Sequence, residues 1–130
     1  MKNRILVDQW LARAQSNLDR ARAGKTGDTI LYEDLCFDCQ QASEKSLKGL
    51  LVAQDLESPH THIIAALLQT LERSGIIIPE EIKASSDLTD YAVNTRYPGM
   101  YEPIRDDEYQ EALAVAERVV AWVHTELRTL

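Results

Sequence analysis

The chain has 130 residues, of which 45% are hydrophobic and 27% charged, and its 14 basic and 21 acidic side chains give a net charge of −7. The composition excludes a largely disordered chain, and the length predicts one domain over residues 1–130. The acidic balance argues against a surface that grips nucleic acid throughout, and a membrane protein is excluded because no apolar run approaches the roughly 18 residues of a span. The N-terminus also lacks the features of a signal peptide, so we expect a cytoplasmic protein.

Residues 4–23 are predicted to form an amphipathic helix, because Val7, Trp10 and Leu18 lie on one stripe at helical spacing. Gly24 is well placed as its C-terminal cap. The first 25 residues carry a net charge of +4, which leaves −11 on the rest of the chain. Such a segment is typical of a solvated helix face; the alternative is a surface for an anion or an acidic partner.

A second helix is predicted over residues 29–56, with a buried stripe rich in small residues. Gly49 is unfavourable inside a helix, so it indicates a close contact with a neighbouring helix. Glu44 and Lys48 are expected to pair at i,i+4 spacing on an exposed flank. The stripe comprises Leu31, Leu35, Cys36, Cys39, Ala42, Ser43, Ser46, Leu47, Leu50 and Leu51.

Cys36 and Cys39 have C-x2-C spacing, and His60 and His62 add H-x-H. A structural zinc site needs four such ligands, usually in turns. Both cysteines lie on the buried stripe of a predicted helix, where a free cysteine serves as a small core residue. We therefore expect no metal site, and no cofactor.

Three further helices complete the predicted fold. A short one begins near Ile63, with Thr61 as a capping residue, and ends at Gly75. A fourth starts at Pro79 and continues until shortly before Pro98, and a fifth begins near residue 106. No segment alternates with period two, so the sequence predicts an all-α, up-and-down antiparallel bundle of about five helices.

Three pieces of the chain resemble the HEPN family (higher eukaryotes and prokaryotes nucleotide-binding). They are Trp10 with Ala14; the segment QQASEKSLKGLL at residues 40–51; and PHTHII, which contains His62, followed by TRYP at residues 95–98. The resemblance implies a helical bundle that often dimerises and a minimal nucleotidyltransferase as partner, in some cases as a toxin–antitoxin pair. Many family members are metal-independent ribonucleases with an R-x4–6-H motif.

That ribonuclease motif is poorly matched. No histidine follows Arg96 at the required spacing, and the formal match is Arg118 with His124, where apolar Val119 follows the arginine. In an unbroken helix six residues place two side chains about 240° apart, so they would share a phosphate only across a two-fold interface. In the alternative without catalysis, Arg118 is an exposed arginine and His124 is a histidine near the frayed end of the last helix.

Other residues are candidates for ligand binding. Lys45 and Lys48 lie on one side of the second helix and could hold phosphate; alternatively they belong to a solvated Glu–Lys face. His62 either contacts a nucleotide or packs at a helix start. The segment around residues 95–109 can stack a base and pair a phosphate, form an interface, or pack as a connection. Its candidates are Arg96, Tyr97, Tyr101 and Arg105.

The leading functional hypothesis is an accessory, nucleotide-binding HEPN module that acts with a minimal nucleotidyltransferase. The first alternative is a ribonuclease toxin with an Arg/His pair across a dimer cleft, and the second is a purely structural dimerisation domain. Trp122 lies off the core stripe of the last helix, and this indicates a protein interface. We therefore expect a homodimer, with nucleotide or RNA as a further partner.

Overall fold

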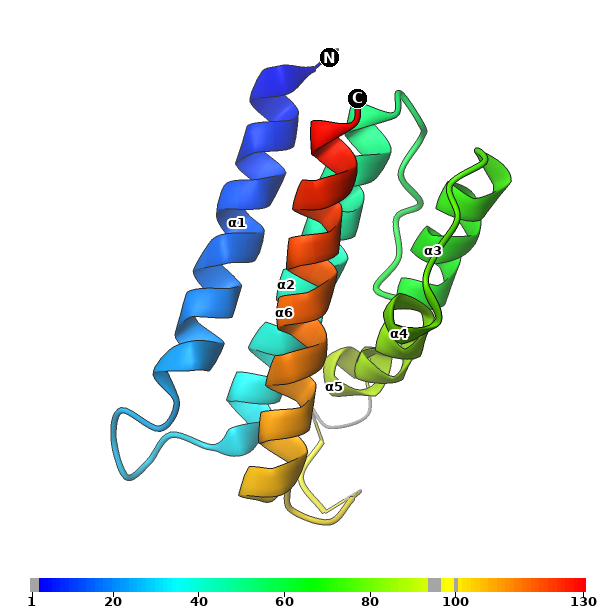
Figure 1. Ribbon diagram of the computed structural model, residues 1–130. Coiled ribbons are helices and arrows are strands. Elements are labelled where there is room, and N and C mark those ends of the chain that lie inside the picture. The colour runs from blue at the N-terminus through cyan, green and yellow to red at the C-terminus, as the bar shows by residue number, and fades with distance from the viewer. Residues whose placement is uncertain (1–2, 94–96, 100) are drawn as a thin grey trace.

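The computed structural model describes residues 3–93, 97–99 and 101–130, and the regular structure within these ranges is entirely helical. The predicted all-α helical bundle is therefore confirmed (Figure 1). None of the helices in these ranges combines the length and apolar character that crossing a bilayer requires. The elements are α1 (Arg4–Ala23), α2 (Tyr32–Ala53), α3 (Ile64–Arg73), α4 (Glu80–Lys83), the 3-10 helix η1 (Ala84–Thr89), α5 (Asp90–Val93) and α6 (Asp106–Arg128).

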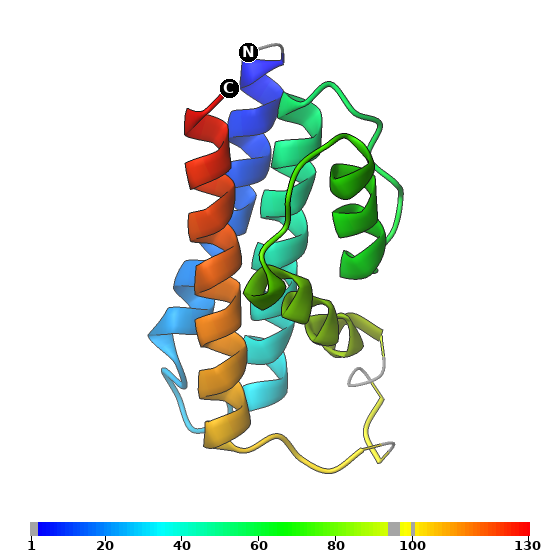
Figure 2. The same cartoon turned by 45° about the vertical axis from the view of Figure 1, so that its right-hand side comes forward.

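The long helix α2 is the centre of the bundle. It runs antiparallel to α1, and α6 lies beside both and begins at the same end as α2, so the two chain termini meet at the opposite end (Figure 1). On the side of α2 away from α1 lie α3 and the α4–α5 segment, as the turned view shows (Figure 2). One face of α2 therefore meets α1, and another meets the segments that follow it.

The predicted core stripes are buried, with exceptions at helix starts. Leu31 was expected on the buried stripe of α2 but is 54% exposed, because it has extended backbone and precedes the first turn. Ile63 occupies the same position before α3 and is also exposed. Trp122, predicted to lie off the core stripe, is half-buried and packs against the edge of the core.

Two glycines act as predicted. A Cβ atom on Gly49 would lie 3.3 Å from the Cβ of Trp10 and 3.4 Å from Cδ2 of Leu11, so the absent side chain lets α1 approach α2 closely. Gly24 ends α1 with a φ of 68°, which an L side chain rarely adopts.

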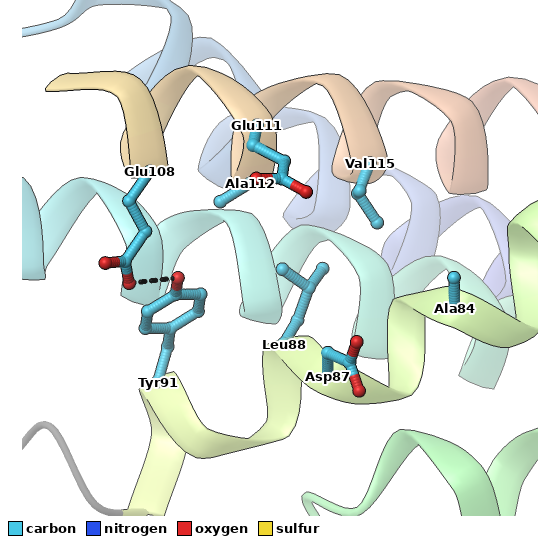
Figure 3. A pocket seen from close by; sticks show the side chains of 8 residues that line it. All are labelled: Ala84, Asp87, Leu88, Tyr91, Glu108, Glu111, Ala112 and Val115. Atoms are coloured by element: carbon cyan, nitrogen blue, oxygen red, sulfur yellow. Dashed lines mark hydrogen bonds between the residues drawn. The ribbon is translucent and has the colours of Figure 1, made fainter.

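The fourth predicted helix is broken into α4, η1 and α5. The hydroxyl of the buried Ser85 donates to the carbonyl of Ile82, three residues earlier. Such local side-chain bonds compete with regular α-helix, and here they accompany a tighter 3-10 turn. The break leads the chain across the bundle, so that Leu88 and Tyr91 face α6 (Figure 3).

The end of the bundle where α2 and α6 begin is held by side chains from distant segments. The Tyr109 hydroxyl donates to the Ala21 carbonyl, and its ring stacks on Tyr32 with centroids 5.3 Å apart. The backbone N–H of Ile104 donates to Oε2 of Glu33 over 3.2 Å. These contacts hold Ile104 and Tyr109 against the start of α2 and the end of α1.

Candidate functional site

Two of the sequence pieces on which the family resemblance rests meet in space around Glu44. Its carboxylate is 3% exposed and accepts hydrogen bonds from Lys48 Nζ at 2.8 Å and from Gln40 Nε2 at 3.0 Å. Nδ1 of His62 lies 3.0 Å from Oε1 of Glu44, and Gln40 also donates to the His62 carbonyl at 3.1 Å. The residues therefore fasten the loop before α3 to α2.

The expected exposed Glu44–Lys48 flank is thus wrong, because the pair exists but its glutamate is buried and its lysine half-buried. Burial by itself would raise the pKa of Glu44. The hydrogen bonds from Lys48, Gln40 and His62 outweigh that effect and leave its pKa lower than is usual for glutamate. Glu44 is therefore a charged, fully partnered core residue.

A second polar network joins α1 to α2. Lys45 Nζ donates to Oδ1 of Asn17 at 2.8 Å, and Nδ2 of Asn17 donates to the buried Asp38 at 2.9 Å. Nε of Arg20 lies 3.5 Å from the other oxygen of Asp38. Burial raises the pKa of Asp38, and the bonds from Asn17 and Arg20 oppose that rise. Lys45 and Lys48, predicted as a phosphate-binding pair, therefore bind different side chains of the protein.

His62 combines a structural contact with access to solvent. Its side chain is 61% exposed, although Nδ1 faces Glu44. The geometry matches the alternative in which this histidine packs at the start of a helix on α2.

Arg118 and His124 do not form a site within one chain. Helix α6 is unbroken from Asp106 to Arg128, so their six-residue spacing puts them about 240° apart around the helix. Arg118 is exposed and His124 half-buried, and neither has a hydrogen bond or ion pair within the described ranges.

The structure separates the candidates of the 95–109 segment. Arg96 lies outside the described residues. Tyr97 is 64% exposed, and Arg105 is an exposed residue that precedes the first turn of α6. Tyr101 lines a hollow beside the start of α2.

That hollow, which we call the loop groove, has a volume of about 380 Å³ and lies between the start of α2 and the residues Pro98 and Tyr101. Tyr101, Tyr91 and Phe37 bring aromatic rings to it, and Glu33 and Asp34 bring carboxylates. Partial burial and the negative charges of Glu33 and Asp34 raise the pKa of Tyr101. The groove is therefore aromatic and electronegative. Its lining residues are Leu31, Glu33, Asp34, Phe37, Tyr91, Pro98 and Tyr101.

A second hollow, the helix groove, has a volume of about 240 Å³ and lies between the η1–α5 segment and α6 (Figure 3). Its Tyr91 hydroxyl donates to Oε2 of Glu108 over 2.6 Å, and burial together with this carboxylate raises the pKa of Tyr91. Because Tyr91 lines both hollows, the two grooves are neighbours. The lining residues are Ala84, Asp87, Leu88, Tyr91, Glu108, Glu111, Ala112 and Val115.

The acidic residues of these grooves were not predicted as a site. Glu33, Asp34 and Glu108 have the sequence signal of helix N-termini, where acids are common. Asp87 and Glu111 carry no motif, and they share a groove only because the fourth helix is broken. A surplus of acids close to tyrosines in sequence is the one signal that could have indicated them.

The described residues contain no group of three side chains suited to a metal ion. Cys36 and Cys39 are buried and form no disulfide, as expected of core cysteines. Burial, followed by the charges of Glu108 and Glu33, raises the pKa of Cys36 to about 12. Such a thiol stays protonated and unreactive near neutral pH.

Comparison with known proteins agrees with the fold and with the sequence pattern. Residues 7–127 match the HEPN domain family. The crystal structure of ST0689, an archaeal HEPN homologue, is 30% identical in sequence with a TM-score of 0.75, over 93% of this chain and 97% of the homologue. The crystal structure of TT1696 from Thermus thermophilus is 32% identical with a TM-score of 0.80, over 92% of this chain and 96% of that protein. No curated protein is significantly similar to the chain. The chain therefore belongs to the HEPN domain family.

Proposed function

We propose that the chain is a non-catalytic accessory HEPN module that binds a minimal nucleotidyltransferase, as in a paired toxin–antitoxin or nucleotide-handling system. The observation that carries this proposal is the pair of neighbouring acidic grooves, lined by tyrosines and by apolar side chains. Aromatic side chains are enriched in protein interfaces, whereas carboxylates repel the phosphates of a nucleotide or RNA. The grooves suit a protein partner better than a nucleic acid.

A nucleotide or RNA fits this chain better on the α1–α2 surface. Arg13 and Arg20 on α1 act electrostatically on Lys45 of α2, and after burial their positive charges help to lower the pKa of Lys45. The carboxylates of Glu44 and Asp38 act on Lys45 in the opposite direction, and an anion near Arg13 and Arg20 would add to that relief. We therefore assign the nucleotide-binding part of the proposal to the exposed Arg13 and Arg20 on this surface, separate from the grooves and from the internal contact of Lys45 with Asn17.

The ribonuclease alternative requires a histidine and a cation at one phosphate. Within one chain, Arg118 and His124 point to different sides of α6. A catalytic pair would therefore need a second protomer to supply the missing member.

Two assays test the proposal. Co-expression with the minimal nucleotidyltransferase of the same organism, followed by size-exclusion chromatography with light scattering, should give a stable complex. Cleavage of RNA by the purified chain without added metal should be absent, and His124→Ala should change nothing. Robust cleavage that is lost in His124→Ala would establish the ribonuclease instead, and failure to form any complex would refute the partner.

A further inference from the structure

The two grooves together form one acidic, aromatic surface, which we call the double groove. It is made by the start of α2, Pro98 and Tyr101, the η1–α5 segment and the first turns of α6, with Tyr91 between its halves. Five carboxylates line it, and no lysine or arginine is among its described lining residues. They are Glu33, Asp34, Asp87, Glu108 and Glu111.

Helix capping explains only part of this charge. Glu33, Asp34 and Glu108 lie in the first turns of α2 and α6, where a carboxylate stabilises the helix dipole. Asp87 lies inside η1, and Glu111 lies beyond the first turn of α6. Across the described ranges, Asp34, Asp87 and Glu111 make no ion pair, so nothing within this part of the chain neutralises them.

The walls between the carboxylates are aromatic or apolar. In the loop groove, the rings of Phe37, Tyr91 and Tyr101 adjoin two carboxylates. In the helix groove, Leu88 lies among Asp87, Glu111 and Glu108, and Val115 lies on the side of Glu111 away from Glu108 (Figure 3). An arginine side chain matches both properties, because its stem packs on apolar surface while its planar cation stacks on aromatic rings and binds carboxylates.

We propose that the double groove is the docking surface for an arginine-bearing basic segment of a protein partner. Charge complementarity selects this occupant, since the groove has five acids and its described lining has no base. This inference rests on the proposed function, because it names the kind of partner segment that would contact the groove. The groove itself is tested without that partner.

The test uses the full chain, labelled with ¹⁵N, and the peptide acetyl-RARARA-amide as the probe. Saturable amide shifts are expected at the start of α2, in η1–α5 and in the first turns of α6. The matched peptide acetyl-QAQAQA-amide should produce none. We expect Asp34→Asn and Glu111→Gln each to weaken binding about two- to fivefold, and the double variant to weaken it by roughly the product of the two.

The control is Asp28→Asn, which removes one exposed carboxylate outside the double groove and should leave the affinity unchanged. Tyr101→Leu keeps an apolar side chain but removes the ring, and should also weaken binding. All variants must keep the wild-type melting temperature, which separates lost binding from lost folding.

The proposal is overturned if the glutamine peptide binds equally well, or if Asp34→Asn and Glu111→Gln behave like Asp28→Asn. It is also overturned if a single-stranded oligonucleotide, rather than the peptide, shifts the amides of the groove. Peptide binding without a nucleotidyltransferase complex would keep this inference and refute the proposed partner. A nucleotidyltransferase complex whose affinity is unchanged by the groove variants would support the proposed partner and refute this inference.

Discussion

The polar networks of α2 and the double groove contain charged side chains in contrasting states. In the networks, the carboxylates of Glu44 and Asp38 are buried, and each receives bonds from amide and cationic side chains. In the double groove, Asp34, Asp87 and Glu111 lie on accessible hollows and, within the described ranges, have no cationic partner. The first set holds the protein together, and the second is available to another molecule.

The contrast shows that a family-typical sequence pattern does not by itself mark a ligand site. Glu44, Lys48 and His62 belong to the most family-like segments, yet they bind one another and fasten a loop. The acidic residues of the double groove come from segments with no motif. Substitutions in the polar networks of α2 should therefore change folding stability. Substitutions in the double groove should change binding.

The largest effect is expected from Glu44→Ala. It leaves the half-buried Lys48 and the buried Gln40 without their shared acceptor, and breaking an ion pair with a buried carboxylate costs about 3–5 kcal/mol of unfolding free energy. Urea denaturation measures the loss. Glu126→Ala, which alters a carboxylate with no such network, should stay within about 0.5 kcal/mol of wild type. Equal losses in the two variants would mean that the network does not stabilise the fold.

A smaller loss is expected from Asn17→Ala. Asn17 donates to Asp38 and accepts from Lys45, so its removal takes one hydrogen bond from each of two buried or half-buried groups, at a cost of about 1–3 kcal/mol. Gln15→Ala is the matched control, because Gln15 makes only an exposed bond to Asp19 on the same helix. Thermal unfolding of the two variants side by side measures the difference. A loss in Gln15→Ala as large as that in Asn17→Ala would contradict the account.

The two buried carboxylates should respond to pH with opposite signs. The pKa of Glu44 is lowered in the folded state, so its stabilisation is present above the pKa of an unfolded glutamate and is lost as the pH falls through the folded value. The melting temperature should therefore fall from about pH 5 to about pH 3, and less steeply in Glu44→Gln.

Asp38 provides the opposite case. Burial raises its pKa in the folded state, so the cost of its charge is relieved as the pH falls. Asp38→Asn removes that relief and should make the acid-induced loss of stability steeper than in wild type. Parallel pH profiles in Glu44→Gln, Asp38→Asn and wild type would show that these groups do not govern acid sensitivity.

The smallest effect on stability is expected in the double groove. Asp34→Asn and Glu111→Gln break no internal ion pair in the described part of the chain, so each should change the unfolding free energy by less than about 0.5 kcal/mol. Guanidinium denaturation measures this. A loss of more than about 1 kcal/mol would identify these residues as structural and would remove the contrast.

The helices could be predicted from sequence because burial follows periodicity. Leu47 and Leu50 on α2, and Val119 and Val123 on α6, recur at helical spacing and are all fully buried. Gly49 was informative for a related reason, since an unfavourable residue inside a helix indicates a close neighbour.

The candidate site was less predictable because it depends on contacts between segments. An i,i+4 pattern shows that Glu44 and Lys48 meet, but the burial of Glu44 depends on the loop that carries His62. The break at Ser85 results from a local hydroxyl bond that helix propensity does not distinguish from a continuing helix. That break brings Tyr91 and Asp87 to α6, so the helix groove has no signature in the linear sequence.

The central claim is that a protein partner binds the double groove while the α1–α2 network stays internal. The most direct measurement is a titration of the ¹⁵N-labelled chain with unlabelled minimal nucleotidyltransferase, followed through its backbone amides. The account predicts saturable shifts of the backbone amides at the start of α2, in η1–α5 and in the first turns of α6. The double variant Asp34→Asn with Glu111→Gln should weaken this binding. Changes confined to the α1–α2 surface, or the absence of any complex, would contradict it.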